Sequence, residues 1–303
     1  MTNVLLGVTF DDLKPFFVLG LALGGVFAVS GVGIVVLYQA TGVVNLAYGA
    51  IGAVGAFLAW TLINTTSCPQ PLAFLVAVAF GGVCNLVYGT LFGPPFANRD
   101  PLVKAIATLG LALIFLGIVN WVWSPGVIAR SLTLPSDQWS YSVAGVFINW
   151  TQIMALLFGI AVTGGTAIFL RTTKLGTAMR SLANDREITA MLGVPVRRVE
   201  SSAWFGSGLV CGASGIFLAD LVALDPFTLT FLVISSLAAA VIGGLKSLWI
   251  TLVAGIVIGV IQSELQVFDT VQKYKDMAPF LLAIIALLWI GRNRLLAVSR
   301  AAR

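Results

Sequence analysis

An uncharged stretch of 84 residues, from Pro15 to Asn98, is the feature that most constrains the fold of this chain. An apolar run of about 18 residues or more is long enough to cross a bilayer as a helix, and such runs recur to the end of the sequence. Only 10% of the residues are charged, against about 25% in a soluble domain. The sequence therefore predicts an all-α, polytopic membrane protein with one transmembrane domain over residues 1–303.

Apolar runs between charged or polar segments predict nine spans, and eight or ten remain possible. The predicted spans are 16–37, 47–63, 72–92, 104–122, 147–170, 201–219, 229–243, 248–264 and 277–291. Only 38–46 (YQATGVVNL) separates the first two. This segment is either a turn or a break where a helix dips and re-enters.

The distribution of basic residues orients these spans, because lysine and arginine accumulate on the cytoplasmic side. With 171–200 inside and the spans alternating, 13 of the 17 lysines and arginines lie inside. The N-terminus is then outside and the C-terminus inside. The net charge of +5 follows from this topology, and we do not expect a nucleic-acid partner.

The segment 171–200 (RTTKLGTAMRSLANDREITAMLGVPVRRVE) carries nine charged side chains. Gly176 allows a turn after the fifth span. Residues 177–183 then form a candidate helix with Met179 and Leu182 on one side. The segment is therefore predicted to be helical and not a loose connection.

A second short helix is predicted to follow. Asn184 is the expected N-cap, with Glu187 at the capping-box spacing, and Gly193 suits the position just after the helix. The helix has an apolar face at helical spacing, formed by Ile188, Met191 and Leu192. Isolated helices of this length are marginal in water, so this one needs a surface: a cytoplasmic protein, or the lipid headgroups if the segment only anchors the topology.

Four segments resemble a known family, in order along nearly the whole chain. They are GTAMRSLAND with AMLGV (176–194), GLALGGVFAVSGVGIVVLYQATGVVNLAYGAIGAVGAF (20–57), AAAVIGGLKSLWITLVAGIVIGVIQSEL (238–265) and YKDMAPFLLAIIALLW (274–289). The family is that of the LivH-type permease subunits of ABC importers for branched-chain amino acids. Two positions depart from the family pattern: Tyr48 stands where a histidine is usual, and Asn184 where an acidic residue is common.

The resemblance implies a type II-like importer permease of the bacterial inner membrane, in contact with membrane lipid. Its partners would be two ATP-binding subunits that hold ATP and Mg, a second permease, and an extracytoplasmic solute-binding protein. For the second permease a homologue is favoured over another copy of this chain, and both pairings remain open. The 171–200 loop would be the coupling loop that docks on the ATPase. Its residues would be Gly176, Arg180, Asn184, Asp185, Glu187, Ile188, Met191, Leu192 and Gly193.

A translocation path is harder to place. Asn45, Tyr48 and Gly49 are candidates for a broken-helix element, whose exposed backbone dipoles can serve polar substrates, although a polar inner turn explains them equally well. The matching Asn85 in NLVYG is interpreted as coincidence. Further candidates are the pair Gly243 and Gly244, in a tight inner turn, and Glu264, whose carboxylate could also lie at the outer interface.

Enzyme chemistry is not expected in this chain. It has no histidine, and its three cysteines are far apart, so no metal or other cofactor is predicted. GGLKS (243–247) has the wrong spacing for a phosphate-binding loop, so ATP hydrolysis would fall to partner subunits. The alternatives are an ABC permease for urea or short amides, and a secondary transporter or channel, which would need intramembrane coupling charges.

Overall fold

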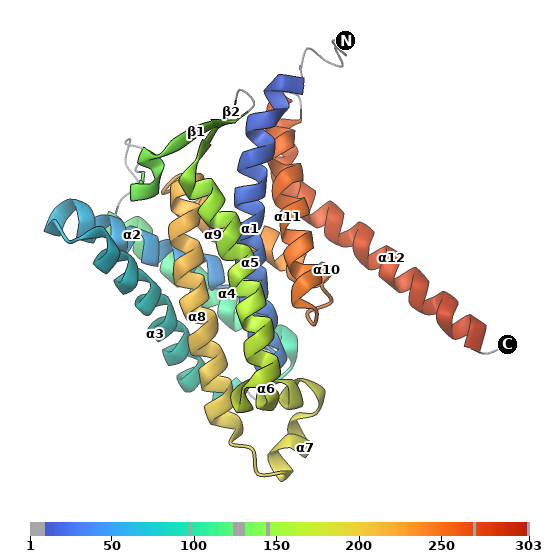
Figure 1. The fold of residues 1–303 in the computed structure, drawn as a ribbon. Helices are drawn as coiled ribbons and strands as arrows, with labels where there is room; N and C mark the ends of the chain where they lie inside the picture. Colours follow the sequence, from blue (N-terminus) through green and yellow to red (C-terminus); the bar gives the residue numbers. More distant parts are fainter. Residues whose placement is uncertain (1–9, 97–98, 124–130, 144–145, 269–270, 302–303) are drawn as a thin grey trace.

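The computed structural model of the protein describes residues 10–96, 99–123, 131–143, 146–268 and 271–301. These residues form a bundle of long helices with one small β-hairpin (Figure 1). The α-helices are α1 (Phe10–Thr41), α2 (Tyr48–Thr66), α3 (Gln70–Phe96), α4 (Pro101–Trp123), α5 (Trp150–Thr172), α6 (Lys174–Asn184), α7 (Arg186–Met191), α8 (Val196–Leu221), α9 (Pro226–Phe231), α10 (Val233–Ile242), α11 (Leu248–Glu264) and α12 (Ala278–Ala301).

The hairpin joins β1 (Ser140–Val143) to β2 (Val146–Asn149) in antiparallel register. Short 3-10 helices lie at Pro135–Gln138, Leu265–Val267 and Gln272–Met277. The predicted all-α class is therefore confirmed, with the hairpin as a small addition.

Helix α1 runs through the middle of the bundle and packs against α5, α8, α10 and α11 (Figure 1). In the most apolar 18-residue stretch of α1, 83% of the stretch is buried. In the corresponding stretch of α4, at the periphery, 17% is buried. Glycine permits the close contacts: a Cβ on Gly24 would lie 2.5 Å from the Cα of Ile256 in α11, and one on Gly25 would lie 2.8 Å from the Cα of Leu156 in α5. Such small-residue packing brings helices together where lipid removes the hydrophobic driving force.

Seven helices in the described residues are long and apolar enough to cross a membrane: α1 to α5, α8 and α11 with its 3-10 extension. They coincide with seven of the nine predicted spans. The predicted span 229–243 is instead divided into α9 and α10, which meet at Leu232. The span predicted at 277–291 falls on α12, whose side chains are described up to Trp289. The count of nine is therefore not confirmed.

The two ends of the bundle differ. Helices α6 and α7 and the turn 243–247 lie at one end, here called the loop end, and the β-hairpin and the start of α1 lie at the other (Figure 1). At the loop end the Nε2 of Gln39, near the end of α1, donates to the carbonyl oxygen of Lys246 at 2.8 Å. Figure 1 also shows α12 projecting away from the other helices.

Candidate functional site

Helix α6 lies across the loop end as an amphipathic helix. The hydroxyl of its N-cap, Thr173, accepts a hydrogen bond from the N–H of Gly176 at 3.0 Å. Met179 and Leu182, which were predicted to share one side of the helix, are both buried, and the helix packs against α1 and α5. Gly176 is inside the first turn and not in a connecting turn: a Cβ there would lie 2.5 Å from the Cα of Leu170. This glycine therefore lets α6 approach the end of α5.

Helix α7 begins one residue later than predicted. Its N-cap is Asp185, whose Oδ1 accepts from the N–H of Ile188 at 2.9 Å, while Asn184 is the last residue of α6. The prediction of an Asn184 cap was therefore wrong. The Asp185 N–H still bonds to the carbonyl of Ser181 in α6 at 3.1 Å, so one residue ends α6 and starts α7. A carboxylate is also well placed at the positive end of a helix dipole.

The end of α7 confirms the prediction for Gly193. This residue has φ of +81°, a region open to glycine at little cost. Its N–H bonds to the carbonyl of Ala190 at 3.0 Å, and the N–H of Val194 bonds to that of Thr189 at 3.4 Å. These two bonds form a Schellman motif, so the short helix has defined caps at both ends.

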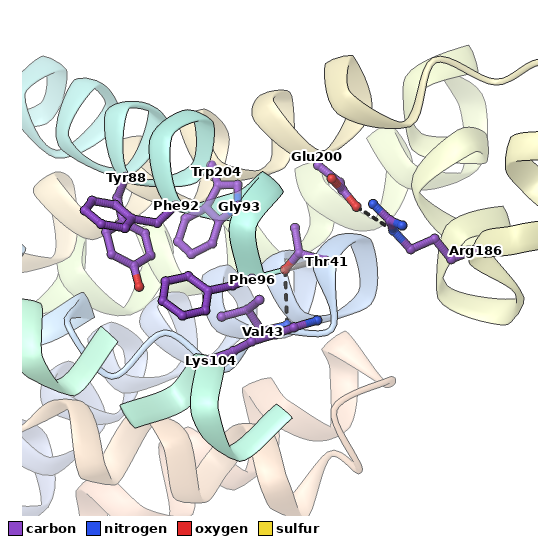
Figure 2. A pocket seen from close by; sticks show the side chains of 10 residues that line it. All are labelled: Thr41, Val43, Tyr88, Phe92, Gly93, Phe96, Lys104, Arg186, Glu200 and Trp204. Atoms are coloured by element: carbon purple, nitrogen blue, oxygen red, sulfur yellow. Dashed lines mark hydrogen bonds and ion pairs between the residues drawn. The ribbon is translucent and has the colours of Figure 1, made fainter. Parts of the chain in front are cut away.

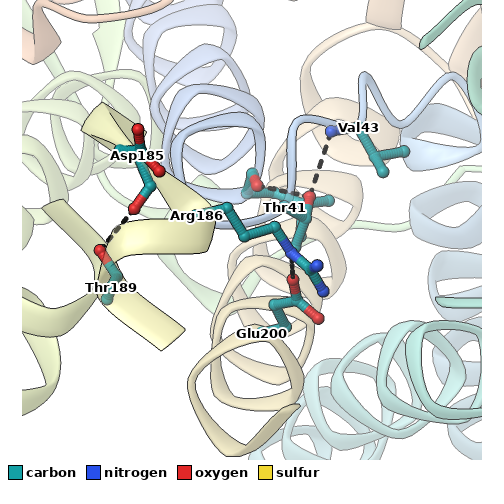
Figure 3. A network of polar contacts seen from close by, with 7 residues as sticks. Thr41, Val43, Asp185, Arg186, Thr189 and Glu200 are labelled. Atoms are coloured by element: carbon teal, nitrogen blue, oxygen red, sulfur yellow. Dashed lines mark hydrogen bonds and ion pairs between the residues drawn. The ribbon is translucent and has the colours of Figure 1, made fainter. Parts of the chain in front are cut away.

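In α7 and its C-cap the apolar side chains are exposed and a polar side chain is buried, which is the reverse of the usual arrangement. Ile188, Met191 and Leu192 are 58%, 84% and 77% exposed. The polar Thr189 is buried, and its hydroxyl donates to the carbonyl of Asp185 at 2.6 Å (Figure 3). A contiguous exposed apolar patch of this kind marks an interaction surface.

An ion pair ties α7 to α8. The Nε of Arg186 lies 2.9 Å from the Oε1 of Glu200, with the arginine side chain 45% exposed and the glutamate 18% exposed (Figure 3). The two residues are 14 positions apart, and the Gly193 turn between them brings α8 back toward α7. No spacing rule for a single helix joins such positions, so the sequence does not predict this ion pair.

Basic side chains surround a large cavity at the loop end. The cavity has a volume of about 800 Å³, and Lys104, Arg180, Arg186 and Lys246 are among the residues that line it. These residues come from α4, α6, α7 and the 243–247 turn. The distribution of lysine and arginine predicts that all four lie on the same side of the membrane, and they do share one end of the bundle.

The segment between α1 and α2 is a break inside the bundle. Asn45 is buried, and its Nδ2 donates to the Oδ1 of Asn85 in α3 at 2.8 Å. Thr108 of α4 accepts from the N–H of Leu46 at 3.0 Å and donates to the carbonyl of Val44 at 3.2 Å. Non-helical backbone inside a membrane protein needs such partners. Interpreting Asn85 as coincidence was wrong, because it is the partner of Asn45.

Helix α2 starts among α1, α8 and α9. The thiol of Cys211 in α8 donates to the carbonyl oxygen of Tyr48 at 2.8 Å, and the Tyr48 hydroxyl lies where a Cβ on Gly33 of α1 would be. Gly49 meets α9, since a Cβ on it would collide with the carbonyl oxygen of Thr230. The start of α2 therefore meets the last turn of α9, just before the α9–α10 break.

Unpaired hydroxyls gather where these two breaks meet. Among the described residues, the buried hydroxyls of Tyr48, Thr230 and Ser236 have no hydrogen-bond partner. Tyr48 and Ser236 line the same small cavity, of about 10 Å³, which is room for a single water molecule. A buried polar group without a partner is costly, so this junction can bind a water molecule.

The other predicted path residues lie elsewhere. Gly243 caps the C-terminal end of α10, and Gly244 has φ of +64° in the predicted tight turn. Glu264 is at the opposite end of α11 from this turn. The structure therefore brings together Asn45, Tyr48 and Gly49 but not the remaining candidates. Within the described part of the chain, no group of three Cys, Asp or Glu side chains could hold a metal ion.

Comparison with known proteins adds a family match over most of the chain. Residues 16–287 match the model of the branched-chain amino acid transport system permease component. The chain is 23% identical over 284 residues to the Escherichia coli permease LivH of a high-affinity branched-chain amino acid transport system, covering 89% of this chain and 91% of LivH. It is 25% identical over 282 residues to Pseudomonas aeruginosa BraD, with the same coverages. It is 27% identical over 242 residues to a probable LivH of Methanocaldococcus jannaschii, covering 76% and 74% of the two chains.

Proposed function

The chain belongs to the family of permease components of branched-chain amino acid transport systems, and we propose that its cargo is a branched-chain amino acid. As a member of this family it is a multi-pass inner-membrane permease subunit of an ABC importer, and it is not an enzyme. The curated relatives named above are permeases of branched-chain amino acid systems, which supports this cargo over urea or short amides.

The exposed apolar face of α7 is the observation that best supports the proposal that separate ATPases drive this permease. Ile188, Met191 and Leu192 point outward from a helix that is capped at both ends, so the face is presented as a unit. We propose that it docks into an ATP-binding subunit, together with the exposed Arg180, Asp185 and Glu187, while the buried Gly176 holds α6 against the end of α5. Two such subunits would hold ATP and Mg, and a homologous second permease and an extracytoplasmic binding protein would complete the importer.

The proposed topology places the loop end in the cytoplasm. The basic cavity lined by Arg180 and Lys246 supports this orientation, because lysine and arginine favour that side. The N-terminus is then outside and the C-terminus inside, with nine spans if the α9–α10 pair and α12 each cross. We further propose that the solute passes near the broken-helix junction at Asn45, Tyr48 and Gly49 as the bundle alternates its opening between the two faces.

Reconstitution tests these proposals. The permease would be placed in proteoliposomes with its homologous partner and the two ATPase subunits, and uptake of radiolabelled L-leucine would be measured with ATP and the binding protein present. We expect uptake that requires every component. Uptake by this chain alone, without ATP, would instead establish a secondary transporter or channel. ATP-dependent uptake of urea or acetamide in place of leucine would reassign the cargo.

A further inference from the structure

The basic cavity at the loop end is large and carries one sign of charge. Its volume of about 800 Å³ falls within the range of about 300–1,000 Å³ that is usual for ligand pockets. No aspartate or glutamate is among the described residues that line it. Its four basic side chains repel one another, so the cavity favours a negatively charged occupant. They are Lys104, Arg180, Arg186 and Lys246.

Segments from across the chain meet around this cavity. Thr41 ends α1, Lys104 begins α4 and Arg186 begins α7, and all three also border a small neighbouring pocket (Figure 2). Arg180 comes from α6, and Lys246 from the 243–247 turn. An occupant therefore contacts the α6–α7 loop and the end of α1 at the same time. The uncharged polar side chains that also line the cavity are Tyr38, Gln39, Thr177, Ser181 and Asn184.

The acidic residues next to these segments have partners of their own. Asp100 accepts from the N–H of Leu102 at the start of α4, at 2.8 Å. Asp185 caps α7, and Glu200 pairs with Arg186 at 2.9 Å. None of these three carboxylates lines the cavity. The cavity itself therefore keeps an excess of positive charge.

The start of α4 places apolar surface beside this charge. Leu102, Val103 and Ile106 are 66%, 42% and 57% exposed, and they lie within one turn of Lys104 on a helix long and apolar enough to cross the membrane. A lysine near the end of such a helix reaches the level of the lipid headgroups. The cavity thus lies at headgroup depth, next to a surface that acyl chains can cover.

We propose that the basic cavity binds the phosphate headgroup of an anionic phospholipid, with the acyl chains against the exposed side of α4. Basic pockets between membrane-spanning helices suit such headgroups. A free phosphate would meet the same charges but would leave the apolar surface of α4 unused. The bound headgroup would bridge α6 and α7 to the end of α1 and so steady the α6–α7 loop. The binding follows from the cavity alone, whereas the choice of the cytoplasmic leaflet rests on the proposed topology.

Lipid binding to the purified permease, without ATPase or binding protein, tests the site directly. Phosphatidylglycerol or phosphatidylcholine with the same acyl chains would be titrated in detergent, and bound lipid counted by native mass spectrometry. We expect phosphatidylglycerol to bind at least tenfold more tightly and to raise the melting temperature. Inorganic phosphate and glycerol 3-phosphate, which lack acyl chains, should not displace it. Equal binding of the two lipids would overturn the proposal, and displacement by either soluble phosphate would show a site for a free anion instead.

Variants test the named residues. Arg180→Gln and Lys246→Gln should each weaken phosphatidylglycerol binding about fivefold, because a basic residue near an anionic lipid surface contributes about 1 kcal/mol and about 1.4 kcal/mol is a factor of ten. Arg180→Lys keeps the charge and should keep most of the binding. The control Arg198→Gln, exposed and outside the lining of the cavity, should leave binding unchanged. An equal loss in Arg198→Gln would show general attraction to a basic surface and would overturn the site.

A further comparison separates the lipid from an acidic segment of the ATPase as the occupant. Thermal melting first checks that the Arg180→Gln, Lys246→Gln double variant folds, and the lipid series on the unaltered protein decides the matter even if it does not. If the double variant binds phosphatidylglycerol normally but loses ATPase docking in phosphatidylcholine membranes, the cavity belongs to the ATPase interface and the proposal is wrong. The cargo takes no part in these measurements, so their failure would leave the proposed function standing.

Discussion

The charge substitution Met191→Glu tests the proposed docking face most directly. Met191 is 84% exposed and is the last residue of α7, so it contributes little to packing inside the permease. Full burial of an aliphatic side chain contributes about 1.5–3 kcal/mol. Given the exposed fractions of Ile188, Met191 and Leu192, a partner that covers the face gains roughly 3–6 kcal/mol, of which Met191 supplies about 2 kcal/mol.

A glutamate at position 191 removes that contribution and adds the cost of desolvating a carboxylate in an apolar interface. With about 1.4 kcal/mol per factor of ten, docking of the ATPase should weaken by roughly a hundredfold or more. The assay is the ratio of leucine transported to ATP hydrolysed by the complete importer in proteoliposomes. We expect this ratio to collapse while membrane insertion and the melting temperature stay unchanged.

Two further variants control the Met191 experiment. Arg198→Gln changes the net charge of the same loop by the same amount and should keep the ratio of the unaltered importer. Met191→Leu retains an apolar side chain and should keep it too. If the ratio of leucine transported to ATP hydrolysed in the Met191→Glu importer stays within twofold of that of the unaltered protein, the docking face is refuted. The alternative, that the loop only anchors the topology on the lipid surface, would then be supported.

Three other variants address the caps and the break. Gly49→Ala should impair transport and lower the melting temperature, because its Cβ collides with the Thr230 carbonyl oxygen; normal uptake would contradict the close approach. Asp185→Ala should destabilise α7 by about 1 kcal/mol through loss of the N-cap, measured by faster hydrogen exchange there, with Asp185→Asn as the matched control. Asn85→Ala should lower stability by about 1–3 kcal/mol because it leaves the buried Asn45 amide unpaired; a double-mutant cycle with Asn45→Ala should show coupling, and additive effects would contradict the hydrogen bond.

Long apolar runs and local capping patterns made much of this fold predictable. The helices, the buried side of α6 and the Gly193 C-terminal motif all depend on residues within a few positions of one another. The boundary between α6 and α7 was missed by one residue because Asn184 and Asp185 are both good N-caps, and only the hydrogen bond to Ile188 decides between them.

Contacts between distant segments were not predictable in this way. Asn45 and Asn85 are 40 positions apart. Nothing in the segments NLAYG and NLVYG, which contain them, indicates that the two side chains form a hydrogen bond. The division of 229–243 at Leu232 has no charge or proline to mark it. The tight packing of Gly176 on Leu170 likewise appears only when α6 folds back across the end of α5.

The α6–α7 loop and the broken-helix junction are held by the same two helices. Helix α6 packs on α1, and α7 is tied to α8 through Arg186. Farther from the loop end, α1 and α8 enclose Tyr48. There the Ser207 hydroxyl of α8 donates to the carbonyl oxygen of Gly33 in α1 at 3.0 Å, and the Cys211 thiol of α8 donates to the carbonyl oxygen of Tyr48. Close-packed interiors transmit displacement, so we infer that a push on the loop shifts α1 against α8 and reaches the start of α2. Full leucine uptake in Gly49→Ala would argue against this route, because that variant alters the junction while leaving the docking face intact.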